Sequence, residues 1–255
     1  MEPLEHNSES GSYNVAGNDD LLSRIKSAFL DKEKWAGLGV RIVSGLVLAA
    51  LVLILLWVGG FPFAFIIFLA ALQMLREWDH LTENEDSLWG VAGLFYVAVP
   101  CASLVWMRNL QVANVESAGL YIVLYVLFAV WATDIGAYFT GRIVGGPKLA
   151  PALSPNKTWA GLGGGIVAAG ITGGLCHLFS PYPTTVLTSI LFGIAIAITA
   201  QGGDLFESWI KRRAGVKDSS TLIPGHGGLL DRVDGLMFSV PFFALFVCIF
   251  SLSRA

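Results

Sequence analysis

Long stretches of this chain carry few or no charged residues, and their lengths suit membrane-spanning helices. A helix needs about 20 apolar residues to cross a bilayer. We expect seven spans: two within 42–75, one at 87–107, one at 117–140, two within 158–203 and one at 235–253. Glycine and proline divide the two longest stretches, at 59–62 and 180–183. The pattern predicts an all-α, polytopic integral membrane protein with about seven transmembrane helices.

The composition supports this class and excludes others. Of the 255 residues, 55% are hydrophobic and 14% are charged, and the mean hydropathy is +0.66. Soluble domains carry about 25% charged residues. A soluble globular enzyme, a disordered chain and a nucleic-acid binder, which needs a basic surface, are therefore excluded. The three cysteines all lie in apolar stretches, which argues against a disulfide framework.

The first 40 residues differ from the rest. Residues 1–20 combine five acidic residues with Ser, Asn and Gly, which is typical of a disordered acidic tail and not of a secretory signal. Within 21–40, Leu21, Ile25 and Phe29 recur at helical spacing among basic residues. This spacing indicates an amphipathic helix at the membrane interface, with an ordinary polar linker as the alternative.

The positions of Lys and Arg predict the orientation of the spans, because loops rich in these residues stay in the cytoplasm. With a cytoplasmic N-terminus, 14 of the 16 basic residues lie on the cytoplasmic side, and only Arg108 and Arg254 lie outside. We therefore expect the two long polar loops, 141–157 and 205–234, to face the cytoplasm.

The first polar loop offers groups that suit a phosphate. Asp134 precedes it, near the end of a span, where an acidic residue is costly unless it is paired, functional or at the interface. Within the loop, Lys157 is accompanied by Ser154 and Thr158, which gives one cation and two hydroxyl groups. The alternative for Lys157 is a residue that only follows the bias toward basic cytoplasmic loops.

The second polar loop is rich in hard oxygen donors. They are Asp218, Asp231 and Asp234, with Asp204 as a fourth candidate. Mg²⁺ prefers carboxylate and phosphate oxygens, and no Cys or His cluster competes for zinc. Asp231 and Asp234 are spaced i, i+3, so a helix would place them on one face. The sequence therefore predicts a magnesium site here.

The same loop contains groups that suit phosphates. The turn Gly225-His226-Gly227-Gly228 can present backbone N–H groups without side-chain obstruction. Basic residues nearby can balance phosphate charge, and they are Lys211, Arg212, Lys217 and Arg232. The alternative is a passive basic loop that binds anionic lipid headgroups.

The span between the two loops is rich in glycine. Gly161 and Gly165 form one GxxxG pair, and Gly170 and Gly174 form a second. Such pairs let helix backbones approach closely. We therefore expect the neighbouring spans to pack tightly and to bring the two loops together.

Residues 208–234 contain every fixed position of the pattern S-x-x-K-R-x4-K-D-x5-P-x-H-G-G-x-x-D-R-x-D. This segment resembles the signature of the phosphatidate cytidylyltransferase (CDP-diacylglycerol synthase) family. Segments 203–208 and 154–158 are similar to family segments as well, and the resemblance covers roughly 120–245. One departure is Ala160, where the family usually has Glu or another polar residue.

The resemblance implies a membrane enzyme that converts CTP and phosphatidic acid to CDP-diacylglycerol and pyrophosphate. It implies Mg²⁺ as cofactor, leaving a second metal or a monovalent cation open, and a homodimer in the bacterial inner membrane that binds no nucleic acid. N-terminal transmembrane helices would occupy 41–116, and the catalytic transmembrane region 117–255. The implied catalytic residues are Asp218, Asp231, Lys211 and Arg212, and Ser208 joins the groups that bind substrate.

Two other functions remain open at this point. A small-anion transporter would carry charged residues near the middle of its spans, whereas here they lie toward the cytoplasmic ends. Another CTP-dependent lipid enzyme, such as a CDP-archaeol synthase or a polyprenol kinase, is the closer alternative.

The predicted orientation can be tested with single cysteines. We expect a cysteine at Asn109 to react with an impermeant thiol reagent on intact cells, because it follows an outward-facing span end. A cysteine at Ser219 should react only after permeabilisation. The opposite labelling pattern would place the second polar loop outside the cell.

Overall fold

A computed structural model describes residues 38–111, 115, 117–223 and 227–252. The expected tail at 1–20 lies outside the described residues. So does the expected interfacial helix at 21–40, except for its last three residues, which begin the first described helix.

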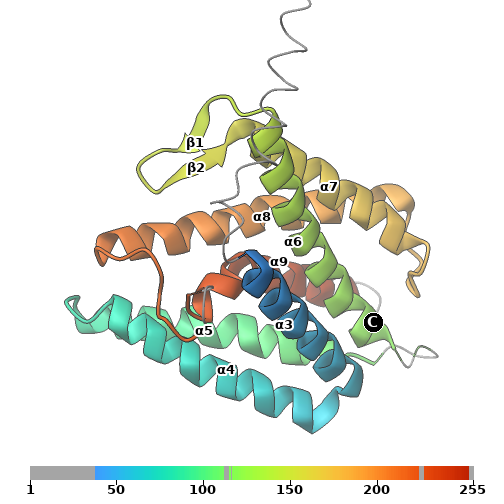
Figure 1. The fold of residues 1–255 in the computed structure, drawn as a ribbon. Helices are drawn as coiled ribbons and strands as arrows, with labels where there is room; N and C mark the ends of the chain where they lie inside the picture. Colours follow the sequence, from blue (N-terminus) through green and yellow to red (C-terminus); the bar gives the residue numbers. More distant parts are fainter. Residues whose placement is uncertain (1–37, 112–114, 116, 224–226, 253–255) are drawn as a thin grey trace, which may run out of the picture. The chain divides into compact units, whose positions relative to one another are not determined.

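Seven helices and one β-hairpin make up the described part of the chain (Figure 1). The helices are α3 Leu38–Val58, α4 Gly60–Leu81, α5 Ser87–Arg108, α6 Ala118–Ile143, α7 Trp159–His177, α8 Val186–Arg213 and α9 Leu230–Leu252. The antiparallel hairpin joins β1 Lys148–Ala150 and β2 Ser154–Thr158, with Lys148 opposite Thr158 and Ala150 opposite Ser154.

The helices confirm a polytopic membrane protein. Within the described residues, six of them, α4 to α9, are long and apolar enough to cross a bilayer, and the apolar helix at 45–58 is shorter. The division at 59–62 is confirmed, because α3 ends before Gly59 and α4 begins after it. Gly59 has φ +63, a conformation that glycine adopts without strain. The count of seven spans stays a prediction.

Two helices extend further than the sequence pattern indicates. α6 continues to Ile143, and α8 continues through 205–213, which the sequence analysis assigns to a loop. The extension of α8 has a local reason, because Asp204, Glu207 and Lys211 follow at i, i+3 and i+7 spacing and lie on one helical face. The polar connection before α9 is therefore only 214–229.

The glycine-rich helix α7 packs closely against α6 on one side and α8 on the other, as expected. A methyl group at Gly165 would lie 2.9 Å from the carbonyl oxygen of Thr133 on α6. A methyl group at Gly193 of α8 would lie 2.3 Å from the carbonyl oxygen of Ala169 on α7. Larger residues would separate these helices, so the small residues set the spacing.

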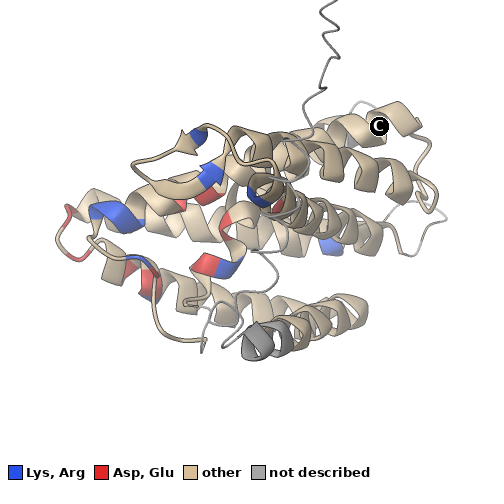
Figure 2. Cartoon of the chain, turned by 45° about the horizontal axis from the view of Figure 1, so that its top comes forward, with Lys and Arg blue, Asp and Glu red and all other residues tan. Residues whose placement is uncertain are grey.

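The most buried helix is α6, which contacts α5, α7, α8 and α9. Its buried side chains form the centre of one apolar cluster, and Trp78, Met74 and Ile210 belong to a second cluster nearer the charged residues. Large apolar side chains on α3, α4 and α5 are exposed, as expected for helices that face lipid. Charged residues gather toward the end of the helices that carries the hairpin (Figure 2).

Candidate active site

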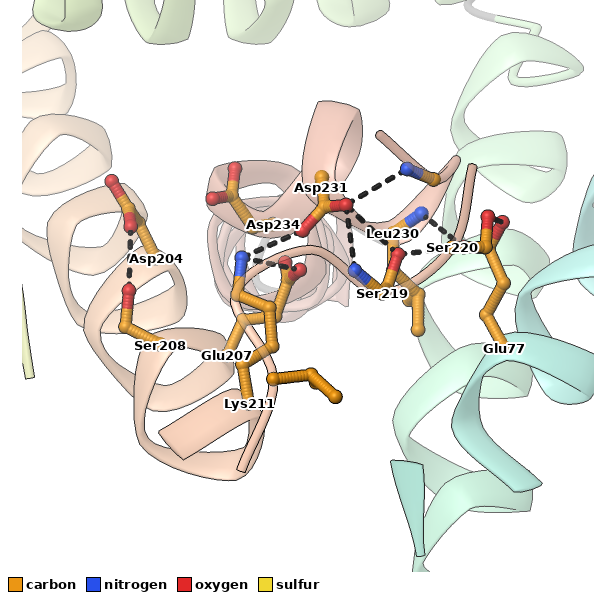
Figure 3. A network of polar contacts seen from close by, with 12 residues as sticks. Glu77, Asp204, Glu207, Ser208, Lys211, Ser219, Ser220, Leu230, Asp231 and Asp234 are labelled. Atoms are coloured by element: carbon orange, nitrogen blue, oxygen red, sulfur yellow. Dashed lines mark hydrogen bonds and ion pairs between the residues drawn. The ribbon is translucent and has the colours of Figure 1, made fainter. Parts of the chain in front are cut away.

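The candidate site forms where the polar ends of α4, α6, α8 and α9 meet the hairpin and the 214–229 connection. A close approach of two helices creates its centre. A methyl group at Gly203 of α8 would lie 2.4 Å from the carbonyl oxygen of Asp234 on α9. This contact brings Asp204 and Asp234 together, and their charges act on each other. Figure 3 shows Asp234 beside Asp231, with Asp204 further away next to Ser208.

The hairpin delivers Lys157 to this centre. Lys157 lies on β2 and forms an ion pair with Asp204 of α8. Its neighbour Thr158 is buried and caps the N-terminus of α7, because its Oγ1 accepts a hydrogen bond of 3.0 Å from the backbone N–H of Gly161. The expected proximity of the two polar segments is therefore observed, and Lys157 is one of the residues that join them.

Asp231 is the most heavily hydrogen-bonded of the predicted site residues. Its Oδ1 accepts from the Lys211 ammonium at 2.6 Å. Its Oδ2 accepts from the backbone N–H groups of Ser219 at 2.9 Å and Gly228 at 2.8 Å, and from the Ser219 hydroxyl at 3.0 Å. Asp231 and Asp234 both lie in the first turns of α9, as their spacing predicts. Asp231 therefore organises the turn that precedes its own helix.

The close packing of this turn explains its two described glycines. Gly227 has φ +81, which side chains rarely adopt, and a methyl group there would lie 2.6 Å from Asp231 Oδ2. A methyl group at Gly228 would lie 2.0 Å from Ser219 Oγ. The predicted phosphate-binding residues Gly225 and His226 lie outside the described residues.

Glu77 of α4 was missed by the sequence analysis, although it holds the same turn. This buried carboxylate accepts hydrogen bonds from the backbone N–H groups of Leu229 at 2.9 Å and Leu230 at 2.8 Å (Figure 3). It also accepts from the hydroxyls of Ser219 at 3.1 Å and Ser220 at 2.8 Å. Glu77 thereby satisfies N–H groups that the start of α9 leaves free.

Glu207 of α8 was missed as well. Its side chain is 1% exposed, and its carboxylate lies 3.1 Å from the Lys211 ammonium, an ion pair without hydrogen-bond geometry. Lys211 therefore lies between Glu207 and Asp231. The buried ammonium of Lys211 keeps its charge, because its two ion pairs with carboxylates compensate for its removal from water.

The remaining predicted residues lie around this centre. Ser208 donates to Asp204 across 3.5 Å, and Asp134 of α6 lies where the charges of Lys157, Asp204 and Arg232 act on it. Three others are exposed, namely Lys217, Asp218 and Arg232. Ser154 is half-buried at the start of β2.

Two arginines at the end of α8 have different surroundings. Arg212 donates from Nε to the carbonyl oxygen of Leu153 at 3.2 Å and from Nη1 to that of Val216 at 3.1 Å, which ties the hairpin to α8. Arg213 hydrogen-bonds Glu85 in the turn between α4 and α5, and this bond lowers the pKa of the Glu85 carboxyl. The ion pair between Arg213 and Glu85 is exposed to solvent, so it contributes little to stability.

The four predicted metal ligands lie in one region but not in one coordination sphere. Among the residues that the structure describes, no three acidic, histidine or cysteine side chains converge on a single point as metal ligands. Lys157 and Lys211 instead hold the carboxylates of Asp204 and Asp231. Asp218 lies beside Gly227, whose added methyl group would approach its Cβ to 3.3 Å.

Comparison with known proteins identifies the family. The profile of the Cytidylyltransferase family matches residues 89–250, which is more than half of the chain. The chain belongs to the cytidylyltransferase family. It is 35% identical to the phosphatidate cytidylyltransferase of Brucella melitensis over 263 residues, covering 85% of this chain and 95% of the relative. It is also 35% identical to the phosphatidate cytidylyltransferase of Bacillus subtilis over 183 residues, which cover 72% of this chain and 68% of that relative.

Membership in the cytidylyltransferase family confirms the resemblance that the sequence motifs indicate. The region matched to the cytidylyltransferase family contains every residue that the motifs place in the site. Glu77 precedes that region, so the turn before α9 depends on a residue outside it.

The role of Glu77 can be tested by Glu77→Ala. We expect a loss of about 2–4 kcal/mol in stability, because buried N–H groups and hydroxyls lose their acceptor. This corresponds to a melting temperature lower by roughly 5–15 °C in detergent. The control is Glu83→Ala, since Glu83 is exposed. Equal melting temperatures for the two variants would contradict the assignment.

Proposed function

We propose that this cytidylyltransferase transfers the cytidylyl group of CTP to phosphatidic acid. A phosphate oxygen of the lipid attacks the α-phosphorus of CTP, and the bond to the leaving pyrophosphate breaks. The observation that carries the proposal is the meeting of Lys157 and Lys211 with an acidic centre at the polar ends of transmembrane helices. Lipid phosphates lie at the level of the polar ends of spanning helices, and the names of the relatives agree with this substrate.

The residues of the site fit this chemistry. The lipid phosphate is ionised at neutral pH, so no strong general base is required. The difficulty is to bring two anions together and to stabilise charge on pyrophosphate. We assign Lys157, Lys211 and Arg212 to phosphates, together with the turn that ends in Gly227 and Gly228. Hydroxyl and cationic side chains at the edge complete the binding groups, and these are Ser154, Thr158, Ser208, Lys217 and Arg232.

Magnesium fits the donor set. Carboxylates outnumber cations in the centre, with Asp134, Asp204, Glu207, Asp231 and Asp234 against Lys157, Lys211 and Arg232. Such a surplus favours a divalent cation with oxygen ligands. Asp218, Asp231 and Asp234, with Asp204 as a further candidate, are the proposed ligands, and their side chains would have to move to share one ion, because they do not form one coordination sphere in this structure. A bound Mg²⁺ would neutralise developing charge on the pyrophosphate.

The proposal includes the location and assembly of the enzyme. The N-terminus and the site would face the cytoplasm, as the distribution of Lys and Arg favours. The enzyme would act as a homodimer in the bacterial inner membrane.

A direct assay separates this function from its alternatives. Purified protein in detergent is incubated with CTP, Mg²⁺ and phosphatidic acid, and the products are analysed. We expect CDP-diacylglycerol and pyrophosphate. A polyprenol kinase would leave phosphatidic acid unchanged and would yield CDP and a phosphorylated polyprenol only after a polyprenol is added. A CDP-archaeol synthase would require the unsaturated archaeol phosphate, and a transporter would release neither product.

We predict that Asp231→Asn lowers kcat at least 100-fold while the protein stays folded. The amide oxygen can keep the bonds from Ser219 and Gly228, but the charge that faces Lys211 and the proposed metal is lost. Initial rates across a Mg²⁺ titration test this prediction, with melting in detergent as the fold control. Wild-type rates at every Mg²⁺ concentration would remove Asp231 from the metal site.

We predict that Lys157→Ala lowers kcat/KM for CTP by about 10- to 150-fold, since a charge-assisted contact to phosphate contributes about 1.5–3 kcal/mol. Lys148→Ala is the matched control, because Lys148 lies exposed on the other strand of the hairpin. If Lys157 only follows the bias toward basic cytoplasmic loops, both variants will stay within twofold of wild type.

A further inference from the structure

An aromatic cleft opens between α5, α8 and α9 and has a volume of about 680 Å³. Its walls are almost entirely apolar. The lining residues include Trp78, Tyr96, Val99, Phe206, Phe238 and Phe242. Tyr96 packs against Trp78 and Phe206, with ring centroids 5.0 and 5.3 Å apart. The cleft is a concave apolar surface of the size that ligand sites have.

The outer edge of the cleft faces the surroundings of the helices. Phe95 and Val99 of α5 are 63% and 44% exposed, and Phe242 of α9 is 40% exposed. In a membrane-spanning chain, exposed apolar side chains on spanning helices contact lipid tails. The cleft is therefore open to lipid.

Residues of the cleft wall adjoin residues of the candidate active site along the chain. On α8, Phe206 lines the cleft and directly precedes Glu207. On α9, Met237 and Phe238 line it, one turn after Asp234. The apolar walls thus continue from the charged centre along the same two helices.

Tyr96 marks the boundary between the two environments. Its ring belongs to the cleft wall, while the charges of Glu207, Asp234 and Asp204 act on its hydroxyl group. This hydroxyl is buried and has no hydrogen-bond partner among the described residues. A buried hydroxyl without a partner is costly, which indicates that a ligand atom satisfies it.

We propose that this cleft binds an acyl chain of the lipid substrate and that Tyr96 positions the glycerol-phosphate end by donating a hydrogen bond to one of its oxygens. The proposal rests on the proposed function and adds the path of the acyl chain. Tyr96 is a positioning residue, since the reacting phosphate groups are held by the lysines and the proposed metal. An acyl chain suits the cleft because its outer edge opens to lipid tails and its wall residues adjoin the residues of the candidate active site.

Val99 lies on the path of a chain bound in this way. Along α5, Val99 lies three residues beyond Tyr96. At 1.5 Å per residue, this is about 4.5 Å further from the start of the helix. An acyl chain whose glycerol end lies at Tyr96 would therefore contact Val99.

The first test is Tyr96→Phe, which removes only the hydroxyl. We expect KM for phosphatidic acid to rise about tenfold, while KM for CTP stays within twofold. A residue that only supports the fold would change both constants or lower the melting temperature instead. Unchanged KM for phosphatidic acid would overturn the role of Tyr96.

The second test is Val99→Trp, which fills part of the cleft. We expect KM for dioleoyl phosphatidic acid to rise about fivefold, roughly the effect of 1 kcal/mol of lost packing, while KM for CTP stays within twofold. The matched control is Val91→Trp, because Val91 is also exposed on α5 but does not line the cleft. An equal KM for phosphatidic acid in the two variants would overturn the cleft as the acyl-chain site.

A binding measurement separates this inference from the proposed function. Native mass spectrometry of the purified protein would report retained dioleoyl phosphatidic acid without turnover. Binding that Val99→Trp weakens and Val91→Trp leaves unchanged supports the cleft, even if wild-type protein makes no CDP-diacylglycerol. Wild-type turnover with equal lipid binding in both variants supports the function and contradicts the cleft.

Discussion

The arrangement of the site depends on two buried carboxylates that hold one turn by its backbone. A carboxylate removed from water needs hydrogen-bond donors, and the start of a helix offers N–H groups without partners. Glu77 and Asp231 meet both needs, because they accept from Ser219, Gly228, Leu229 and Leu230. The beginning of α9 is thereby fixed against α4, and Asp234 is placed one turn further along.

Close helix packing brings the other charged groups to this turn. Glycine at Gly203 lets the backbone of α8 meet that of α9, and glycines of α7 bring α6 and the hairpin next to α8. Lys157 can then reach Asp204 from a different segment of the chain. Charged side chains near a bilayer are costly unless they are paired, so the lysines and the carboxylates stabilise one another at the polar end.

Charged side chains of the candidate site and apolar side chains of the cleft are neighbours on α8 and α9. Glu207 and Phe206 are neighbours on α8, and so are Asp234 and Met237, one turn apart on α9. The charged residues suit nucleotide and lipid phosphates, and the aromatic residues suit a hydrocarbon chain. An enzyme whose two substrates differ so much in polarity requires both surfaces side by side.

The sequence by itself determined the class of protein, most of the helices and the signature of the family. These features are local or periodic: uncharged stretches of membrane-spanning length, the i, i+3 spacing of Asp231 and Asp234, and glycines at GxxxG spacing. Only the tertiary structure revealed the roles of Glu77 and Glu207 and the cap that Thr158 provides for α7. Glu77 lies 142 residues before Ser219, and no spacing rule connects residues so far apart. Their contact follows from helix packing, which depends on side chains from the whole chain at once.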